Sequence, residues 1–454
     1  MRKAVVVIAL FSAILVLAST GAAIVIQANA NPTWHIQVVD PEGAGGFIAF
    51  DSFDKPHIIY YIDEFFNTNR TGKNYAVWTG EKWNTEHLNS TVGNIFIMDT
   101  NNNPHVISTS NGTLNDAPLT NPVWNLKEIG IAGVAGDTIT LDSGGTLHEV
   151  SADYIYSESN NSYASHLYYT TWTKTGVSVQ TIGEANSTAQ VAYQRLYPHS
   201  IAVDPKGNPH IIFVEQHEIA LYPRVSGTPF MITNMIKYAV WTGSNWKIQT
   251  LATNTTDPSR NANLVLDSKG QPQLAYLHEN RTYTSDYGSY RAKRSLEYIY
   301  FDGFAWVNQT IESESNNDYY GQPALRLDSN GNPQVFFFKV NYQPTIDYDL
   351  LYARWTGTAW DTQKIWTLTP NSYGSAGFSK IAFDSHGNPR LTYDTVMGTI
   401  RGAYRYGNLT YLAIDMSFTT SPLLVPIISG GIIAIICIAA IIYFRKRRKE
   451  AQQT

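Results

Sequence analysis

One segment of the sequence recurs seven times, and this repetition restricts the possible folds more than any other feature. In its clearest copies an apolar stretch runs into an Asp, a Gly-Asn-Pro turn and a second apolar stretch, as in IAVDPKGNPHIIF from Ile201 and IAFDSHGNPRLTY from Ile381. A period of this length is typical of folds that repeat one supersecondary unit. The anchor aspartates, spaced 43 to 63 residues apart, are Asp51, Asp99, Asp142, Asp204, Asp267, Asp328 and Asp384.

Each repeat predicts four short β-strands. Leu264 and Leu266 precede Asp267 by three and one residues, and the same alternation in the other copies indicates a half-buried strand. The Asp-x-x-Gly-Asn-Pro segment predicts a turn that Asp caps, in which Gly takes a positive φ and Pro opens the next strand. A later block, WTGSNW from Trp241, predicts a second hairpin with Gly at its tip and Trp on both arms.

Four-stranded units repeated in this way predict an all-β fold, a β-propeller of about seven blades. The sequence leaves six or eight blades open. Residues 34–38 (WHIQV) resemble the outer-strand segment 246–250 (WKIQT), so the N-terminal strand is one candidate for the outer strand of the last blade, and residues 408–415 are the other. Composition agrees with a strand-rich chain, because 13% of the residues are aromatic, 15% are charged and 32 are Gly.

Both ends of the chain are apolar and flanked by basic residues. Residues 423–444 carry no charge and are long enough to cross a bilayer as a helix, and the basic run that follows predicts a cytoplasmic C-terminus. Residues 1–30 predict a signal peptide or an uncleaved N-terminal anchor. The expected organisation is a signal segment at 1–30, an extracellular propeller at 31–416, a linker at 417–422, a transmembrane helix at 423–444 and a cytoplasmic tail at 445–454.

The charge distribution and the cysteine content restrict which partners the protein can bind and which kind of organism it comes from. The net charge is −5, but the basic ends hold seven basic residues and one acid, so the region between them carries 25 basic and 36 acidic residues. Such a surface repels phosphate backbones, which argues against nucleic acid as a partner. The one cysteine, Cys437, lies in the predicted membrane helix, and an ectodomain without disulfides favours a prokaryotic surface protein, bacterial or archaeal.

Nine Asn-x-Ser/Thr sequons lie between the two apolar ends, in the region expected outside the cell. N-glycosylation acts on such sequons in exported chains, so these positions are candidate glycosylation sites. They are Asn69, Asn89, Asn111, Asn160, Asn186, Asn254, Asn280, Asn308 and Asn408.

Recognition is expected at the face that carries the connections between second and third strands. These connections vary widely in length, whereas the hairpins of the other face are short and repetitive. Tyr side chains suit sugars and protein surfaces. The candidate ligand-binding residues are Tyr283, Tyr287, Tyr290, Tyr319, Tyr320, Tyr342, His217, His278, Arg281 and Lys339. The candidate catalytic acids are Asp63, Glu215 and Glu279.

We expect no metal and no cofactor. His57, His105 and His210 recur after the turn Pro, but they belong to different blades and lie too far apart to share one ion. The segment 99–103 (DTNNN) resembles the start of a calcium loop, yet the equivalent position of other copies is basic and no acid closes the loop, which favours a plain turn.

The tandem blades over residues 34–415 resemble the sialidase-like propellers with BNR (Asp-box) repeats. The hairpin 241–246 stands where that family has its Asp-box, and it keeps a Gly and a Trp but lacks the Asp. The resemblance implies a propeller fold. The arginine clamp of sialidases has no recognisable counterpart among Arg281, Arg291, Arg294, Arg326 and Arg401.

The leading prediction is therefore a membrane-anchored extracellular β-propeller that binds glycan, peptide or a surface protein and is not an enzyme. A rigid repeat scaffold with variable Tyr-rich loops and no catalytic constellation favours this function. The alternative is a sialidase-like glycan-cleaving enzyme, a glycoside hydrolase or lyase, on the same scaffold. A passive component of the cell envelope is a third possibility.

Overall fold

The computed structural model is an all-β protein. A compact unit, Thr33–Asp415, contains most of the described strands, and Met1–Pro32 with Met416–Thr454 form the other unit. The described strands assemble into seven sheets, three with four strands and four with five, and the strand pairs with a described register are antiparallel. The structure describes residues 23–62, 73–88, 95–99, 101–110, 113–120, 123–124, 127–128, 134–157, 162–173, 176–188, 192–219, 231–253, 262–283, 290–313, 319–321, 323–341, 346–369, 376–379, 381–400 and 403–425.

The first four sheets follow one another along the chain. Sheet 1 is β2 (Gly43–Phe50), β3 (Pro56–Ile62), β4 (Lys73–Trp78) and β5 (Trp83–Leu88). Sheet 2 is β6 (Ile95–Met98), β7 (Pro104–Ser110), β8 (Thr113–Thr120), β9 (Val123–Trp124) and β10 (Lys127–Glu128). Sheet 3 is β11 (Val134–Leu141), β12 (Leu147–Ala152), β13 (Ile155–Ser157), β14 (Ser162–Thr173) and β15 (Gly176–Thr188). Sheet 4 is β16 (Ala192–Val203), β17 (Pro209–Ile219), β18 (Met231–Trp241) and β19 (Trp246–Thr253).

The last three sheets continue the series. Sheet 5 is β20 (Ala262–Leu266), β21 (Pro272–Tyr283), β22 (Tyr290–Phe301) and β23 (Trp306–Ser313). Sheet 6 is β24 (Tyr319–Tyr320), β25 (Ala324–Leu327), β26 (Pro333–Asn341), β27 (Asp347–Trp355) and β28 (Trp360–Leu368). Sheet 7 is β29 (Ala376–Phe378), β30 (Ala382–Phe383), β31 (Pro389–Ile400), β32 (Ala403–Val425) and β1 (Ala23–Asp40).

The repeated Asp forms the predicted turn between the first and second strands. In sheet 4, Asp204 Oδ1 accepts hydrogen bonds from the backbone N–H groups of Lys206 and Asn208, both at 2.8 Å. Gly207 has a φ of 84° and donates its N–H to the Asp204 carbonyl at 2.9 Å. Since this conformation costs Gly little, the Gly and the capping Asp recur together.

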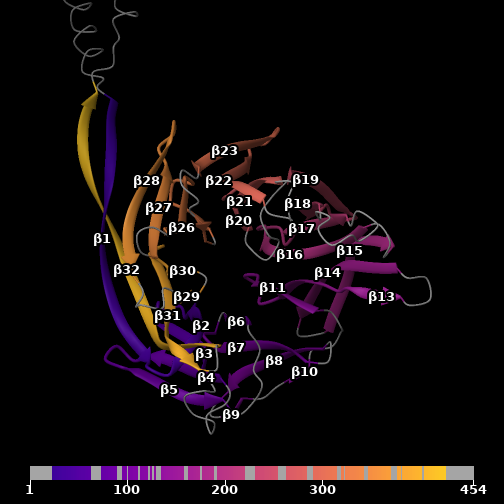
Figure 1. The fold of residues 1–454 in the computed structure, drawn as a ribbon, viewed down its shortest axis with the longest axis horizontal. Coiled ribbons are helices and arrows are strands. Elements are labelled where there is room, and N and C mark those ends of the chain that lie inside the picture. Colours follow the sequence, from indigo (N-terminus) through magenta and orange to yellow (C-terminus); the bar gives the residue numbers. More distant parts are fainter. Residues whose placement is uncertain are drawn as a thin grey trace, which may run out of the picture. The chain divides into compact units, whose positions relative to one another are not determined.

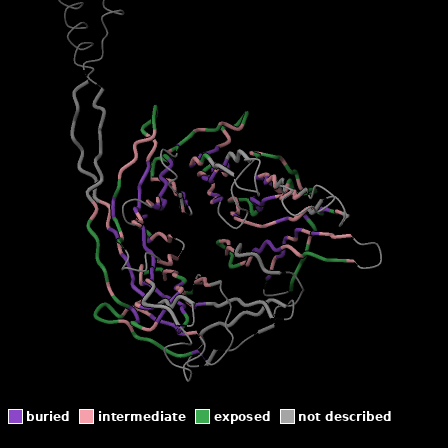
Figure 2. Tube along the Cα trace, viewed as in Figure 1, coloured by how far each residue is buried: buried purple, intermediate pink, exposed green. Residues whose placement is uncertain are grey.

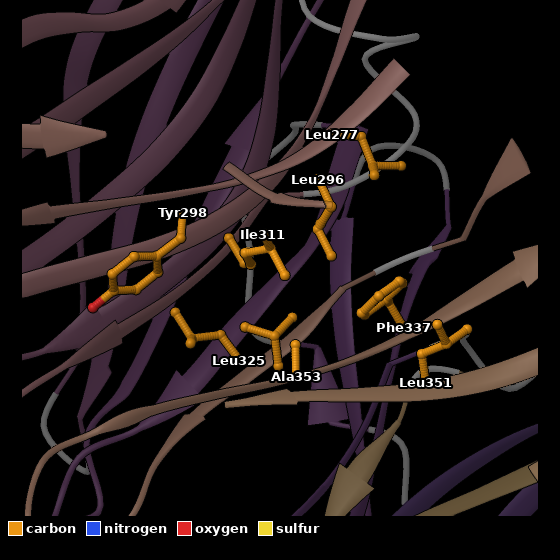
Figure 3. Packing of buried hydrophobic residues seen from close by; sticks show 10 residues of the cluster. Leu277, Leu296, Tyr298, Ile311, Leu325, Phe337, Leu351 and Ala353 are labelled. Carbon is orange, nitrogen blue, oxygen red and sulfur yellow. The ribbon is translucent and has the colours of Figure 1, made fainter. Parts of the chain in front are cut away.

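The core lies between neighbouring sheets. Figure 3 shows one such layer, in which Leu277 and Leu296 of sheet 5 pack with Leu325 and Phe337 of sheet 6. Alternate residues of the middle strands point to opposite faces, so each sheet contributes to the layer on either side of it. Buried residues accordingly follow the middle strands, and exposed ones are frequent on the outer strands (Figure 2).

Within Thr33–Asp415 the sheets pack in chain order and the last meets the first (Figure 1). The innermost strands β2, β6, β11, β16, β20 and β25 contact one another in succession, and β2 also contacts β29 and β31. Sheets 6 and 7 meet through the rings of Phe336 and Phe383, whose centroids lie 5.5 Å apart. This closed series of sheets is β-propeller-like, as the repeat predicts.

The N-terminal strand is the outer strand of the last sheet, because β1 lies next to β32 in the order β1-β32-β31-β29. This confirms the resemblance of residues 34–38 to an outer strand. The other candidate, residues 408–415, is corrected: it belongs to β32, the third strand of that sheet. Chain proximity favoured residues 408–415, but the described strand order gives the edge of β32 to β1.

The described residues at the two chain ends lie in strands β1 and β32. The expected linker at 417–422 and residues Leu423–Val425 of the expected membrane helix lie in β32, and the last residues of the expected signal segment lie in β1. Among the residues that the structure describes, no helix is long and apolar enough to cross a bilayer. Residues 1–22 and 426–454, which hold most of both predicted segments, lie outside the described residues.

Candidate functional site

The Asp turns of neighbouring sheets contact one another, which defines one face of the ring of sheets. Ser385 of sheet 7 donates its N–H to Asp54 Oδ1 of sheet 1 at 2.7 Å, and Ser52 donates its N–H to Asn102 Oδ1 of sheet 2 at 2.7 Å. Since the strands are antiparallel, the connections between second and third strands emerge at the other end. We call that end the long-loop face, and it is where the sequence predicts the site.

The predicted residues of sheet 4 form an ion-paired group on this face. Glu215 Oε1 lies 2.6 Å from His217 Nε2, and Glu215 Oε2 lies 3.0 Å from Lys237 Nζ. Burial raises the pKa of Glu215, but hydrogen bonds from His217 and Lys237 outweigh it and lower the pKa below its usual value. Glu215 is therefore ionised near neutral pH and already contacts Lys237 and His217, which suits a structural role better than a general acid.

Two more predicted residues are also ion-paired. The carboxylate of Glu279 is buried and accepts a hydrogen bond from Arg294 Nε at 2.7 Å. Lys339 donates to Glu312 Oε1 at 3.1 Å, which joins sheets 5 and 6. His278 lies beside Glu279 on β21, opposite Ser295 of β22.

For the remaining predicted residues the structure gives the backbone alone or nothing. The backbone of Tyr283 pairs with that of Tyr290 at the end of the β21–β22 ladder, next to the connection between these strands. Arg281 lies opposite Ala292 in the same ladder. Tyr319 and Tyr320 form β24 and pair with Val340 and Lys339. Asp63, Tyr287 and Tyr342 lie outside the described residues.

The structure brings together a group that the sequence did not single out. The guanidinium carbon of Arg195, on innermost strand β16, lies 4.5 Å from the ring centroid of Tyr154, and Arg195 Nη1 donates to the Tyr197 hydroxyl at 3.4 Å. Tyr154 stacks on Tyr163 with centroids 5.1 Å apart, and Tyr156 lies 4.7 Å from Tyr163. We call these five residues the Arg195 cluster.

Among the described residues, Arg195 has no acidic partner. Arg294, Arg354 and Arg390 each pair with a carboxylate, whereas no carboxylate among the described residues lies within ion-pair distance of Arg195. Its Nε is buried and has no hydrogen-bond partner in the described part of the chain. The hydrogen bond to Tyr197 raises the pKa of Arg195, so the cation is permanent.

Next to Tyr154, the side chain of Asp153 holds a His and a Tyr. Asp153 Oδ1 lies 2.8 Å from His166 Nδ1, and Tyr168 donates its hydroxyl to Asp153 Oδ2 at 3.1 Å. A carboxylate at Nδ1 favours the tautomer that carries the proton there, which leaves Nε2 as a proton acceptor. Burial, followed by the contact with Asp153, raises the pKa of Tyr168. His166 is partly exposed.

Ser165 joins this group to the strand of Arg195. Its hydroxyl donates to the Asp153 carbonyl at 2.9 Å and accepts the N–H of Leu196 at 3.1 Å. The cationic Arg195 cluster and the Asp153–His166–Tyr168 group are thus held on one framework between sheets 3 and 4. An irregular segment after β12 supplies Asp153 and Tyr154, and no repeat position marks them in the sequence.

The described histidines at this position of the repeat contact tyrosines, and the side chain of His105 lies outside the described residues. His148 Nδ1 and His210 Nδ1 each lie 2.6 Å from a Tyr hydroxyl of their own sheet, Tyr169 and Tyr238, and His57 contacts Tyr75 in the same way. No group of metal-ligating residues occurs among the described side chains. His148 belongs to this set although the sequence comparison missed it, because Leu147 stands where its copy would have Pro.

The calcium-like segment is a turn as predicted. Asp99 Oδ1 accepts the N–H groups of Asn101 and Asn103 at 2.9 and 2.7 Å, and Asp99 Oδ2 accepts from the Asn103 amide at 2.9 Å.

Three sequons have a described environment. Asn186 and Asn308 are exposed, and Asn308 donates to Glu297 Oε2 at 3.3 Å. Asn408 is half-buried with a φ of 60°, and its N–H donates to the Pro41 carbonyl at 2.9 Å. Asn280 has a described backbone in β21, and Asn69, Asn89, Asn111, Asn160 and Asn254 lie outside the described residues.

Comparison with known proteins supports the fold. No protein-family model and no curated protein sequence matches the chain. A solved polysaccharide lyase, an ulvan lyase bound to GlcA(1-4)Rha3S, matches with a TM-score of 0.54 and 10% identity over 84% of this chain and 95% of its own. A second ulvan lyase structure matches with a TM-score of 0.52 and 11% identity over 87% and 95%. At this identity the similarity establishes a β-propeller-like all-β fold and nothing finer.

Proposed function

We propose that this protein binds an acidic glycan at the long-loop face, through Arg195 and the tyrosines around it. The observation that carries the proposal is a guanidinium that meets no carboxylate in the described part of the chain and lies among Tyr154, Tyr156, Tyr163 and Tyr197. Tyr rings suit the apolar faces of sugars, and Arg matches a carboxylate or sulfate in a bidentate way. The glucuronate and sulfated rhamnose bound by the structurally similar ulvan lyase agree with this ligand class.

The wider organisation is part of the same proposal. We place a seven-bladed propeller, related in architecture to the sialidase-like propellers, outside a prokaryotic cell and attach it to the membrane through residues 423–444. The sequence supports this arrangement through the uncharged run and the basic residues that follow it. Cell-surface proteolysis of intact cells tests it, because an extracellular propeller is cleaved while the basic tail stays protected.

Calorimetric titration of the full-length protein with glucuronate-containing oligosaccharides tests the binding site. Replacing Arg195 with Ala removes charge-assisted hydrogen bonds worth about 1.5–3 kcal/mol, so the dissociation constant should rise about 10- to 100-fold. Lys269→Ala is the matched control, since Lys269 is an exposed cation in an Asp turn of the other face. Equal affinity of Arg195→Ala and wild type would sink the proposal.

The Asp153–His166–Tyr168 group favours a second function, cleavage of the same glycan by β-elimination. His166 Nε2 would accept the proton from C5 of a uronate whose carboxylate lies on Arg195, and its electron pair would form the C4–C5 double bond as the C4–O bond breaks. The leaving oxygen would take a proton from water or from a protein hydroxyl. Ultraviolet absorbance of the unsaturated product tests this, and a wild-type protein that binds the polymer without producing absorbance is a binding protein alone.

A further inference from the structure

We propose a second anion subsite on sheet 1, formed by Lys73, Phe47 and Tyr61, which binds another acidic residue of the same glycan chain. This inference rests on the proposed glycan binding at the Arg195 cluster and deepens it. It makes the ligand an acidic oligosaccharide rather than a single sugar.

The three side chains come from adjacent strands at the long-loop face. Lys73 begins β4 and lies directly opposite Tyr61 on β3, and its Nζ lies 5.9 Å from the ring centroid of Phe47 on β2. A lysine ammonium at this distance from an aromatic face is stabilised by the ring quadrupole. The subsite therefore combines one cation with two aromatic rings, as the Arg195 cluster does.

A β-bulge in β2 determines how the Tyr61 ring lies in this subsite. The register of β2 and β3 shifts between Ala44 and Phe47, and Gly45 takes a φ of 61° there. The ring of Tyr61 lies against Gly45 so closely that a Cβ on residue 45 would stand 2.1 Å from the Tyr61 Cε1. Gly at this position thus permits the ring to lie over the backbone, which is the role of Gly where another group approaches closely.

The pattern of exposed aromatics singles out the two clusters. Phe47 is 36% exposed and Tyr61 is 45% exposed, comparable with Tyr154 at 36% and Tyr156 at 47%. The other exposed aromatic side chains of the described chain lie on the outer strand β1, as Trp34 does, or at hairpin tips, as Phe53 and Phe304 do. Exposed aromatic rings next to a cation are thus confined, among the described residues, to these two clusters.

Burial adds an electrostatic reason for anion binding. The surroundings of Lys73 lower its pKa to about 8, because burial disfavours the charged form. A carboxylate or sulfate brought next to the amine would offset that cost by stabilising the ammonium.

The two clusters are too far apart for one sugar. Sheet 2 contacts both sheet 1 and sheet 3, and packed sheets lie about 10 Å apart, so two sheet spacings separate the clusters by roughly 20 Å. An oligosaccharide that reaches both clusters gains affinity with length, because its second contact forms within an existing complex.

The test compares oligoglucuronates of two and eight residues on the full-length protein. Lys73→Gln should weaken binding of the octasaccharide about tenfold and leave the disaccharide unchanged, since a lost charged hydrogen bond is worth about 1.5 kcal/mol. Lys73→Arg, which keeps the charge, should retain most of the octasaccharide affinity. Unchanged melting temperatures of both variants show that the fold is intact.

The outcomes separate this inference from the proposed function. If Arg195→Ala weakens both oligosaccharides while Lys73→Gln changes neither, the second subsite is wrong and the Arg195 site stands. If Lys73→Gln weakens the disaccharide as much as the octasaccharide, Lys73 belongs to one shared site and the two-site proposal fails. Failure of the wild type to bind either oligosaccharide overturns both.

Discussion

The indole Nε1–H of Trp83, in β5 of sheet 1, donates a hydrogen bond to the side-chain Oε1 of Gln37, in β1 of sheet 7, at 3.2 Å. The same bond joins Trp246 to Gln180 at 3.2 Å, and Trp306 to Gln249 at 2.8 Å. A Tyr of the preceding sheet packs edge-on against each of these indoles, Tyr411 against Trp83 with centroids 5.3 Å apart. The N-terminal strand thus uses the contact that joins neighbouring sheets elsewhere.

Gln37→Ala should lower the free energy of unfolding by about 1 kcal/mol, the usual contribution of such a hydrogen bond. Gln249→Ala removes the equivalent bond between sheets 4 and 5 and is the control. Hydrogen exchange should distinguish the two, because only the Gln37 change should speed exchange in β1 and β32. Equal exchange in these strands would show that the bond does not hold the closing strand.

Asp54 holds the turns of sheets 7 and 1 together from a left-handed backbone. Its φ is 59°, at a position where five other copies have Gly and one has Asn102, and its carboxylate accepts hydrogen bonds from the N–H and hydroxyl of Ser385 at 2.7 and 2.6 Å. Asp54→Ala loses both bonds and keeps the strained φ, so it should cost about 1–2 kcal/mol. Asp54→Gly loses the bonds but relieves the strain and should cost less. Urea unfolding measures the stability of both variants. A larger loss of stability for Asp54→Gly than for Asp54→Ala would show that backbone strain at residue 54 is not important.

Buried His210 should make stability depend on pH. Burial lowers its pKa from 6.5 although Asp204 raises it, so the folded protein takes up this proton less readily than the unfolded chain. The contribution of His210 to the free energy of unfolding should therefore be at its maximum above about pH 6.5. It should decrease as the pH falls toward the pKa of His210 in the folded protein. Burial lowers the pKa of His57 in the same way, so His57 adds to the decrease in unfolding free energy at low pH.

His210→Gln tests this pH dependence. Sheet 5 carries Gln273 at the same position, where it accepts the Tyr298 hydroxyl at 2.5 Å, so the variant can keep the bond to Tyr238. The decline of unfolding free energy between about pH 7.5 and 5.5 should be smaller than in wild type. An identical decline would assign the pH dependence to other groups.

Tyr154→Leu should weaken glycan binding without unfolding the protein. Tyr154 is 36% exposed, so its loss removes a stacking surface and the ring above Arg195 rather than core packing. We expect Tyr154→Leu to lose about 1 kcal/mol of binding free energy, or roughly fivefold in affinity. Tyr154→Phe keeps the aromatic ring and should retain most of the wild-type affinity. Wild-type affinity of the Leu variant would remove Tyr154 from the site.

The repeat units were predictable because their signals are local. Asp204 accepts hydrogen bonds from residues two and four positions ahead of it, and Gly207 adopts its positive φ within the same turn. The outer-strand role of residues 34–38 was visible as a resemblance, yet the choice against 408–415 depended on pairing between chain ends almost 400 residues apart. A local pattern cannot rank two such long-range pairings.

The candidate site was less predictable than the sheets. The sequence predicts Glu215 and Glu279 as candidate catalytic acids. The cations that pair with them, Lys237 and Arg294, lie on the neighbouring third strand of each sheet. Arg195 and Tyr154 are 41 residues apart and lie outside the repeat motif, so their contact follows from the packing of sheet 3 against sheet 4. No spacing in the sequence encodes that contact.

The sequence by itself determined the repeating strands, their turns and the face on which the irregular connections emerge, because hydrogen bonds and φ preferences within a few residues dictate them. The tertiary structure alone decided which strand closes the last sheet and which side chains surround Arg195. Those outcomes depend on which sheets become neighbours, since an ion pair or a stacked ring forms only where packing brings the two groups together.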